Sequence, residues 1–214
     1  MTESSISNPR NHWFAATGGI ALVGALSFTY LDIPTALWFR QFNDTAFHQI
    51  FKLVSRFGES QWYLAGGLLL YVAMRSKRPG LSATGLLLSL SVAISGLLTD
   101  ILKVVLGRAR PKLFFREALY GFDFLHFEPA WLSFPSGHSA TAFSVAATIW
   151  FAAPPYRIYA LLWAALIAFS RIALTQHYIS DVLFGSLLGA ATTALLYNRY
   201  FRNPSHACIP GKIP

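Results

Sequence analysis

Residues 80–99, GLSATGLLLSLSVAISGLLT, decide the fold class of this protein. This stretch of 20 residues contains no Lys, Arg, Asp or Glu, and a helix of about that length crosses the hydrocarbon core of a bilayer. Residues 11–31 form a second full-length stretch without those four residue types. The 214-residue chain is 54% hydrophobic and only 12% charged, whereas soluble domains are about a quarter charged. The sequence therefore predicts an integral membrane protein.

Four shorter apolar stretches predict further spans, at residues 60–74, 139–153, 158–170 and 182–198. Each of them must borrow flanking residues to cross the bilayer. We therefore predict an all-α, polytopic membrane helix bundle with six transmembrane helices, or five, in one domain spanning residues 1–214. The first span is longer than the apolar core of a signal peptide, so we expect it to be retained. Residues 1–10 and 203–214 are expected to be flexible tails.

An amphipathic stretch lies between the first two spans. Its apolar residues recur at the three-to-four spacing of one helical face, and its polar residues occupy other positions on the wheel: Phe47, Ile50, Phe51, Val54 and Phe57 against His48, Lys52 and Arg56. This pattern predicts an interfacial helix. Such a helix either packs on the bundle alone or also helps to admit a lipid substrate.

The composition also limits the partners and the cofactors. The single Cys208 excludes a disulfide framework and a four-cysteine zinc site. The net charge of +8 comes from basic residues scattered over an apolar chain, which suits lipid head groups and phosphate chemistry. No basic stripe or reading motif for nucleic acid accompanies the charge, so we expect membrane lipids and no nucleic acid as partners. The oligomeric state is left open.

Basic residues also predict the orientation in the membrane. With six spans, both termini share one side with the turn at residues 75–78 and with Arg157. That side carries 8 Lys and Arg against 9 on the other, or 8 against 6 once Lys103, Arg110 and Arg171 are assigned to chemistry. The positive-inside rule then makes it cytoplasmic. We predict a multi-pass protein of the cytoplasmic membrane, with the three polar clusters described next on the outer face.

The first cluster pairs Lys103 and Arg110, seven residues apart and followed by Pro111. Two helical turns would place both cations on one face, and the proline fits the end of that helix. The second cluster is Pro135-Ser136-Gly137-His138, directly before an apolar run. A hydroxyl, a glycine and the N–H groups of a helix N-terminus together suit a phosphate. Taken alone, snorkelling cations and a capped helix with a surface histidine explain these two clusters as well.

The third cluster runs from Ser170 and Arg171 to His177 and Asp181. At a spacing of four, the carboxylate of Asp181 can accept a hydrogen bond from one imidazole nitrogen, which leaves the other nitrogen as a nucleophile. Such a pair alone is more often structural. Because the spans alternate in direction, all three clusters fall on the same face of the membrane, and this favours one shared site.

The three clusters, Lys-x6-Arg-Pro, Pro-Ser-Gly-His and Ser-Arg-x5-His-x3-Asp, resemble the signature of the type 2 phosphatidic acid phosphatase superfamily. The resemblance covers about residues 60–200. It implies a metal-independent hydrolase that needs no cofactor and acts on lipid phosphates through a phosphohistidine. His177 would attack phosphorus, Asp181 would orient it, and His138 would protonate the leaving oxygen. The phosphoryl oxygens would be held by Lys103, Arg110, Ser136, Gly137 and Arg171.

The resemblance leaves the substrate open among undecaprenyl diphosphate, phosphatidylglycerophosphate, phosphatidic acid and lipid A phosphate. The alternative functions are a lipid-to-lipid phosphotransferase with the same site and a non-catalytic lipid-binding or transport protein. A vanadium-dependent haloperoxidase shares the signature, but six spans argue against it. Near the site, Arg108 and Lys112 are candidates for contacts to a head group or a second phosphate. The aromatic loop at residues 112–134 suits a lid at the interface that discriminates substrates.

Overall fold

The computed structural model describes residues 9–202, and this part is all-helical without a β-strand, as predicted. Most of the two expected tails, residues 1–8 and 203–214, lies outside the described residues, whereas residues 9 and 10 already belong to the first helix. The elements are α1 Pro9–Tyr30, α2 Asp32–Arg40, α3 Ala46–Arg56, α4 Ser60–Met74, α5 Pro79–Leu106, α6 Pro111–Glu117, η1 Pro129–Trp131, α7 Gly137–Ala152, η2 Pro154–Tyr156, α8 Arg157–Ala173, α9 Ile179–Leu196 and the π-helical η3 Tyr197–Phe201.

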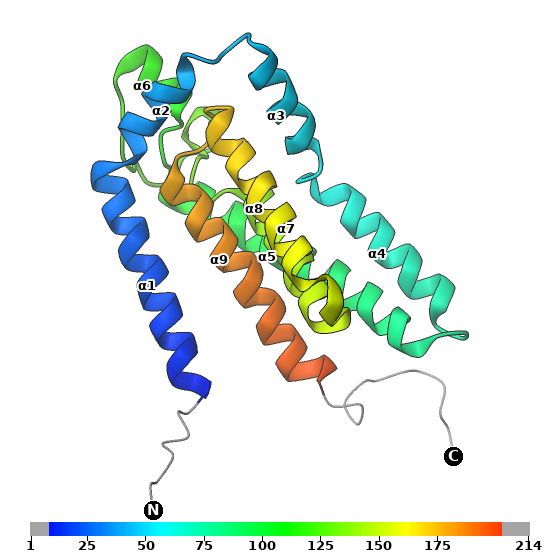
Figure 1. Cartoon of the computed structure of the whole chain (residues 1–214). Coiled ribbons are helices and arrows are strands. Elements are labelled where there is room, and N and C mark those ends of the chain that lie inside the picture. Colours follow the sequence, from blue (N-terminus) through cyan, green and yellow to red (C-terminus); the bar gives the residue numbers. More distant parts are fainter. Residues whose placement is uncertain (1–8, 203–214) are drawn as a thin grey trace, which may run out of the picture.

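The long helices run side by side in one elongated bundle (Figure 1). Helix α7 is central and packs against α5, α8 and α9, while α4 packs on α5 and α1 on α9. The long connection between α5 and α7, which contains α6 and η1, and the short connection between α8 and α9 gather at one end of this bundle (Figure 1). The two loop regions that carry the sequence motifs therefore meet at that end.

The described part holds three helical segments long and apolar enough to span a membrane: Pro79–Leu106, Pro154–Ala173 and Ile179–Phe201. A fourth arises if Leu22–Tyr30 and Asp32–Arg40, which are bent by 57°, form one broken span. Helices α4 and α7 have 15 and 16 residues. At about 1.5 Å per residue each covers only about 24 Å of a core about 30 Å thick. The count of six spans therefore stays a prediction.

Small residues let the central helices approach closely. A Cβ atom on Gly185 of α9 would lie 2.3 Å from the carbonyl oxygen of Ser136, and one on Gly189 would lie 2.1 Å from that of Ala140. At the same interface, the Ser144 hydroxyl donates to the Gly189 carbonyl at 3.2 Å. Close backbone approach and interhelical hydrogen bonds replace the hydrophobic effect as the source of helix association in lipid. This packing fixes the start of α7 against the start of α9.

The amphipathic stretch forms α3, which begins after its N-cap Thr45 and packs on α8. Its apolar face contacts this neighbour through Phe51, whose ring centroid lies 5.4 Å from that of Phe169, and Val54 joins the buried cluster around Ile167. The helix is thus present where the sequence predicts it. Its location at the membrane interface stays a prediction.

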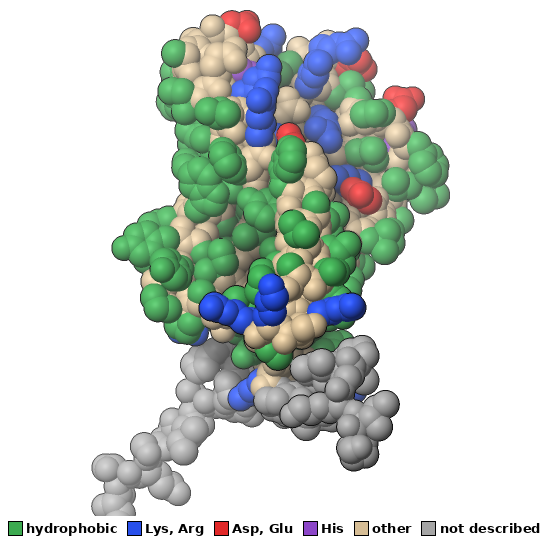
Figure 2. Space-filling model, turned by 90° about the vertical axis from the view of Figure 1, so that its right-hand side faces the viewer, with side chains coloured by type: hydrophobic (Ala, Val, Ile, Leu, Met, Phe, Trp, Pro, Cys, Tyr) green, Lys and Arg blue, Asp and Glu red, His purple; other side chains and the backbone are tan. Residues whose placement is uncertain are grey.

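Charged side chains gather at the two ends of the molecule and leave an apolar band between them (Figure 2). The exposed large hydrophobic residues include Leu69, Leu162 and Leu195. A band of this kind is expected for a surface that faces lipid, because the bilayer core solvates no charge. The basic turn at residues 75–78 lies at the end opposite the loops that carry the three clusters (Figure 1).

Candidate active site

The three sequence clusters meet at the loop end of the bundle. The backbone N–H of Ser136, in the second cluster, donates to the carbonyl oxygen of Asp181 in the third at 3.0 Å. The Nζ atom of Lys103, in the first cluster, lies 3.3 Å from the position that a Cβ on Gly137 would take. A side chain at residue 137 would therefore crowd the ammonium group. The fold thus brings together residues from α5, the start of α7 and the start of α9.

His177 lies in the short turn between α8 and α9, with only 4% of its surface exposed. Its Nδ1 atom is 2.8 Å from the backbone carbonyl oxygen of Ser133 and 3.5 Å from Oδ2 of Asp181. A carbonyl oxygen can only accept, so Nδ1 carries the proton and Nε2 keeps its lone pair. Burial lowers the pKa of His177 to about 4, with Arg110 and Arg171 acting in the same direction and Asp181 opposing them. The free site therefore holds a neutral imidazole with one nitrogen available as a nucleophile.

Asp181 holds the surrounding chain as well as facing the histidine. Its fully buried carboxylate accepts hydrogen bonds from the Ser133 hydroxyl at 2.6 Å, from the backbone N–H of Tyr178 at 2.9 Å, and from Arg108. The sequence predicts Asp181 as the acceptor for His177, but the nearer acceptor is the carbonyl of Ser133. Because α9 begins at Ile179, His177 precedes the helix and does not lie one turn before Asp181 on the same helical face. Asp181 therefore fixes His177 in part through Ser133.

His138 lies in the first turn of α7, which begins at Gly137 after Ser136, as the motif predicts. Four side chains are close enough to act on it electrostatically: Arg171, His177, Lys103 and Arg110. The ring is also held from behind, since a Cβ on Gly58 would lie 2.8 Å from its Cδ2 atom. The hydroxyl of buried Ser136 accepts from Ser139 at 2.9 Å. The two histidines thus share one site, although His138 comes from α7 and His177 from the α8–α9 turn.

Three cations surround this site. Arg110 is the N-cap residue of α6 and donates to the Leu132 carbonyl at 3.1 Å, and Arg171 donates to the hydroxyl of Ser55 on α3. The Nε atoms of both arginines are shielded from solvent and have no hydrogen-bond partner within residues 9–202. Lys103 forms an ion pair with the exposed Asp100 at 3.0 Å. Buried donors without a partner are rare, and an anion bound between them would satisfy both.

The expected geometry of the first cluster is wrong in one respect. Helix α5 ends at Leu106, because Gly107 caps it with a φ of 56°, and Pro111 begins a new helix. Lys103 and Arg110 therefore do not lie on one helical face. The spacing of seven still serves the site, since the break redirects the chain and leaves Arg110 at the start of α6.

Arg108 is a structural residue, so its expected contact to a head group or a second phosphate is also wrong. It has no exposed surface, and it bridges Asp32 at the start of α2, at 2.7 Å, to Asp181. The rings of Phe28 and Tyr178 lie 4.9 and 4.7 Å from its guanidinium carbon. Burial would lower the pKa of Arg108, but Asp181 and Asp32 raise it above its usual value. The Asp32–Arg108–Asp181 triad thereby connects α2 to the site.

Sequence reasoning missed Asp32, a member of this triad, and also Ser133 and Ser180, which form hydrogen bonds with its members. Ser180 donates its backbone N–H to Asp32 at 3.1 Å, and Arg108 donates to the Ser180 hydroxyl at 2.7 Å. A charged residue directly after the first apolar span was the available signal for Asp32, because a carboxylate at membrane depth needs a partner. No local signal marks Ser133, whose role depends on the path of the loop.

The comparisons with known proteins agree with the motifs. Residues 84–205 match the PAP2 superfamily. This chain belongs to the PAP2 superfamily. It is 32% identical over 190 residues to the lipid A 1-phosphatase of Rhizobium etli, covering 82% of this chain and 81% of that protein. It is also 28% identical over 138 residues to the undecaprenyl-diphosphatase of Sulfolobus acidocaldarius, covering 64% of this chain and 63% of that one.

Two solved structures share the fold of this PAP2 protein. The transmembrane PAP2-type phosphatidylglycerolphosphate phosphatase from Bacillus subtilis superposes with a TM-score of 0.60 at 22% identity, covering 84% of this chain and 93% of that one. LpxE of Aquifex aeolicus gives a TM-score of 0.53 at 21% identity, covering 78% and 95%. The resemblance identified from the three motifs and the predicted membrane helix bundle are both confirmed.

Proposed function

We propose that this PAP2 protein hydrolyses lipid phosphates through a phosphohistidine formed on Nε2 of His177. The observation that carries the proposal is the 2.8 Å contact between Nδ1 of His177 and the carbonyl oxygen of Ser133. The Ser133 carbonyl fixes the proton on Nδ1, so Nε2 faces the reaction as a neutral nucleophile. Its lowered pKa, about 4, keeps the imidazole neutral across the physiological range. Family relatives named as lipid phosphatases support the same reaction class.

The reaction consists of two displacements at phosphorus. In the first, Nε2 of His177 forms a bond to phosphorus while the bond to the lipid oxygen breaks, and His138 donates a proton to that oxygen. In the second, water attacks the phosphohistidine, the N–P bond breaks, and His138 accepts a proton from the water. Inorganic phosphate and a lipid alcohol, or a lipid monophosphate from a diphosphate, are the products.

Charge neutralisation is supplied by Lys103, Arg110 and Arg171. Phosphoryl transfer depends mainly on positioning and on stabilising the charge of the equatorial oxygens. The Nε donors of Arg110 and Arg171, which have no partner within residues 9–202, provide this stabilisation without reorganisation, because the protein already holds both side chains in place. The N–H groups at the start of α7, including that of Gly137, add a helix N-terminus to the cradle.

The substrate we propose first is the 1-phosphate of lipid A. Two relatives named lipid A 1-phosphatase, from Rhizobium etli and Rhizobium johnstonii, are 32% and 33% identical and cover 82% and 69% of this chain. We place the site on the outer face of the cytoplasmic membrane, because the basic turn at residues 75–78 lies at the opposite end. An impermeant label in intact cells should then modify the loop at residues 112–134 and spare that turn. The reverse pattern would invert the orientation.

The test is phosphate release by purified protein in detergent, with chelator present, from lipid A, undecaprenyl diphosphate and phosphatidic acid. Wild-type protein and His126→Ala, a matched loss of an imidazole outside the site, should be active. His177→Ala should be inactive. Rapid acid-free quenching should trap a phosphoenzyme that is stable to base and labile to acid in the wild type only. Full activity of His177→Ala would remove His177 as nucleophile.

A further inference from the structure

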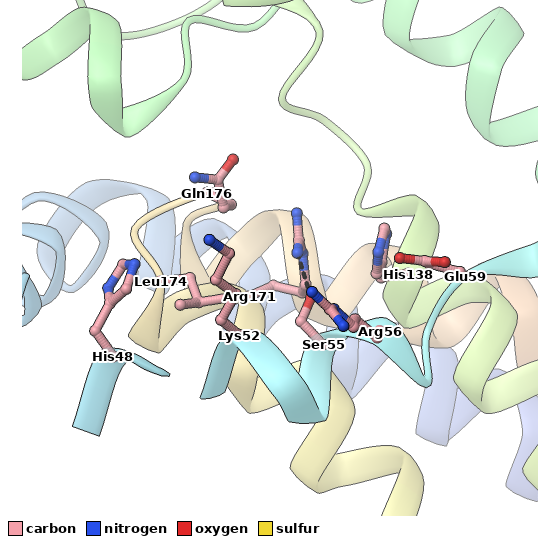
Figure 3. Close-up of a pocket in the computed structure, with 9 residues that line it drawn as sticks. All are labelled: His48, Lys52, Ser55, Arg56, Glu59, His138, Arg171, Leu174 and Gln176. Carbon is pink, nitrogen blue, oxygen red and sulfur yellow. Dashed lines mark hydrogen bonds between the residues drawn. The ribbon is translucent and has the colours of Figure 1, made fainter. Parts of the chain in front are cut away.

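The polar face of α3 lines a pocket that also contains His138, the proposed proton donor. The pocket has a volume of about 410 Å³, within the usual range for small-molecule sites. In Figure 3, His48 lies at one end of the pocket and His138 with Glu59 at the other. Its lining comes from α3, the α3–α4 turn, the start of α7 and the end of α8: His48, Lys52, Ser55, Arg56, Glu59, His138, Arg171, Leu174 and Gln176.

The residues of α3 that line this pocket lie on one helical stripe. Positions 48, 52, 55 and 56 follow the spacing of i, i+4, i+7 and i+8, and Glu59 follows in the α3–α4 turn. At about 1.5 Å per residue, positions 48 to 56 extend over about 12 Å. The apolar face of the same helix packs on α8. The amphipathic pattern of α3 therefore separates a packing face from a face directed at the pocket.

This pocket is positively charged. Its lining contains three cationic side chains, those of Lys52, Arg56 and Arg171, and one carboxylate, that of Glu59, so the net charge of the lining is +2. The Oε2 atom of Glu59 already accepts hydrogen bonds from Gln61 at 2.7 Å and Trp62 at 3.2 Å. Within residues 9–202, neither Lys52 nor Arg56 forms an ion pair. Two cations one turn apart are thus available to an anion.

The pocket is continuous with the phosphoryl site, because Arg171 and His138 belong to both. Arg171 donates to the hydroxyl of Ser55, which lies between Lys52 and Arg56 on the stripe and is buried. At the far end, Nδ1 of His48 is shielded from solvent and has no hydrogen-bond partner in the described part of the chain. A single phosphoryl group held by Lys103, Arg110 and Arg171 leaves the α3 side of this volume to another group.

We propose that the polar stripe of α3 is a second phosphate subsite, in which Lys52 and Arg56 bind a phosphate group of the substrate other than the one being cleaved. This proposal rests on the proposed function and deepens it, because it selects substrates that carry two phosphates. The second phosphate is either the neighbouring group of a diphosphate or a separate phosphate elsewhere on the head group. Lipid monophosphates would react without using the subsite.

The experiment compares wild type with Lys52→Gln/Arg56→Gln on two matched substrate pairs in detergent. One pair is an isoprenyl diphosphate and the corresponding monophosphate; the other is bisphosphorylated lipid A and lipid A lacking the phosphate that is not cleaved. We expect kcat/KM to fall about tenfold on at least one bisphosphorylated substrate, mainly through KM, because each exposed ion pair contributes several-fold. On the monophosphates the change should stay within about threefold. The affected pair identifies the source of the second phosphate.

Two control variants, the first of them charge-matched, separate a subsite from general attraction of anionic lipids. Lys77→Gln/Arg78→Gln removes the same charges at the opposite end, and Arg116→Gln removes an exposed arginine that does not line the pocket. Both should behave as wild type. Equal losses on mono- and bisphosphorylated substrates, no loss on either, or the same selective loss in a control would each overturn the subsite. A wild type inactive on all four lipids would instead overturn the proposed function, and the subsite with it.

Discussion

Replacing Asp32 by Asn should destabilise the protein severely, although Asp32 touches no part of the proposed substrate. The carboxylate of Asp32 is fully buried and accepts from Arg108 at 2.7 Å, from Ser27 at 2.9 Å and from the backbone of Ser180 at 3.1 Å. The amide of Asn keeps the shape but removes the negative charge and directs two donors at other donors. Arg108, with no exposed surface, would keep Asp181 as its one remaining ion-pair partner in the described part of the chain.

Breaking a buried ion pair by removing one partner costs about 3–5 kcal/mol, because the other charge stays buried. For a chain of this size, each kcal/mol corresponds to about 3 °C in Tm, so Asp32→Asn should lower Tm by about 10 °C. The assay is thermal unfolding of purified protein in detergent. Glu117→Gln, which removes an exposed carboxylate 4.0 Å from Arg116, should change Tm by less than about 2 °C.

A double-mutant cycle tests the reasoning further. Arg108→Gln should be at least as harmful as Asp32→Asn, because two buried carboxylates then lose their shared cation. The double variant should lose less than the sum of the two, by about 2 kcal/mol, since neither Asp32 nor Arg108 then keeps an unpaired charge. Additive losses, or an Asp32→Asn variant with the Tm of Glu117→Gln, would refute the argument that the triad is held by buried charge.

Three further outcomes are expected. Gly58→Ala should lower kcat at least tenfold, because its Cβ would lie 2.8 Å from the ring of His138, whereas Gly66→Ala, which meets no neighbour within 4 Å, should be silent in the same phosphate-release assay. The free energy of unfolding of the wild type should fall by about 3 kcal/mol as the pH drops from about 6.5 to about 4, because His177 is protonated near pH 6.5 in the unfolded state but only at a pKa of about 4 in the folded state. The pH dependence of Tm in His177→Asn should lack this component. A pH profile of the variant identical to that of the wild type would contradict the buried neutral imidazole. Phosphate release should be unaffected by chelator, because the proposed charge neutralisation comes from side chains, and loss of activity restored by a divalent cation would contradict it.

The sequence predicts the helical architecture well because membrane spans are a matter of composition over about 20 residues. It also predicts which residues meet at the site, because consecutive spans alternate in direction and three motifs of fixed spacing therefore fall on the same face of the membrane. It does not predict their partners. Ser133 reaches His177 across 44 positions, and Asp32 reaches Arg108 across 76. Such contacts depend on how a loop folds back and on how the α1–α2 bend aims a carboxylate, and neither is encoded in a local pattern.

Helix α3 illustrates a partial success of the same kind. Its spacing predicts an amphipathic helix, and the structure contains one. The pattern does not indicate what the polar face meets, because a helical wheel gives relative directions around an axis and no neighbours. In the structure that face lines the pocket beside His138 and does not simply face water. The structure shows the packing of α3 on α8 and the pocket beside its polar face, and a role of that face in handling substrate stays a prediction.

The segment Gly107–Pro111 explains how one short stretch supplies both a structural and a functional cation. After Gly107 ends α5, the chain reaches Arg110 in an extended conformation, with φ −74° and ψ 157°, before α6 begins. The two arginines nevertheless have different partners, because Arg108 is paired with two buried carboxylates whereas Arg110 donates to the Leu132 carbonyl. Arg108 is directed to Asp32 and Asp181 and forms an ion pair with each, while Arg110 forms no ion pair in the described part of the chain. Because Arg108 neutralises Asp181, that carboxylate does not capture Arg110 or Arg171. The buried triad thus leaves the site cations available to the phosphate, so Arg108→Gln, which removes the cation that pairs with Asp181, should be felt in catalysis as well as in stability.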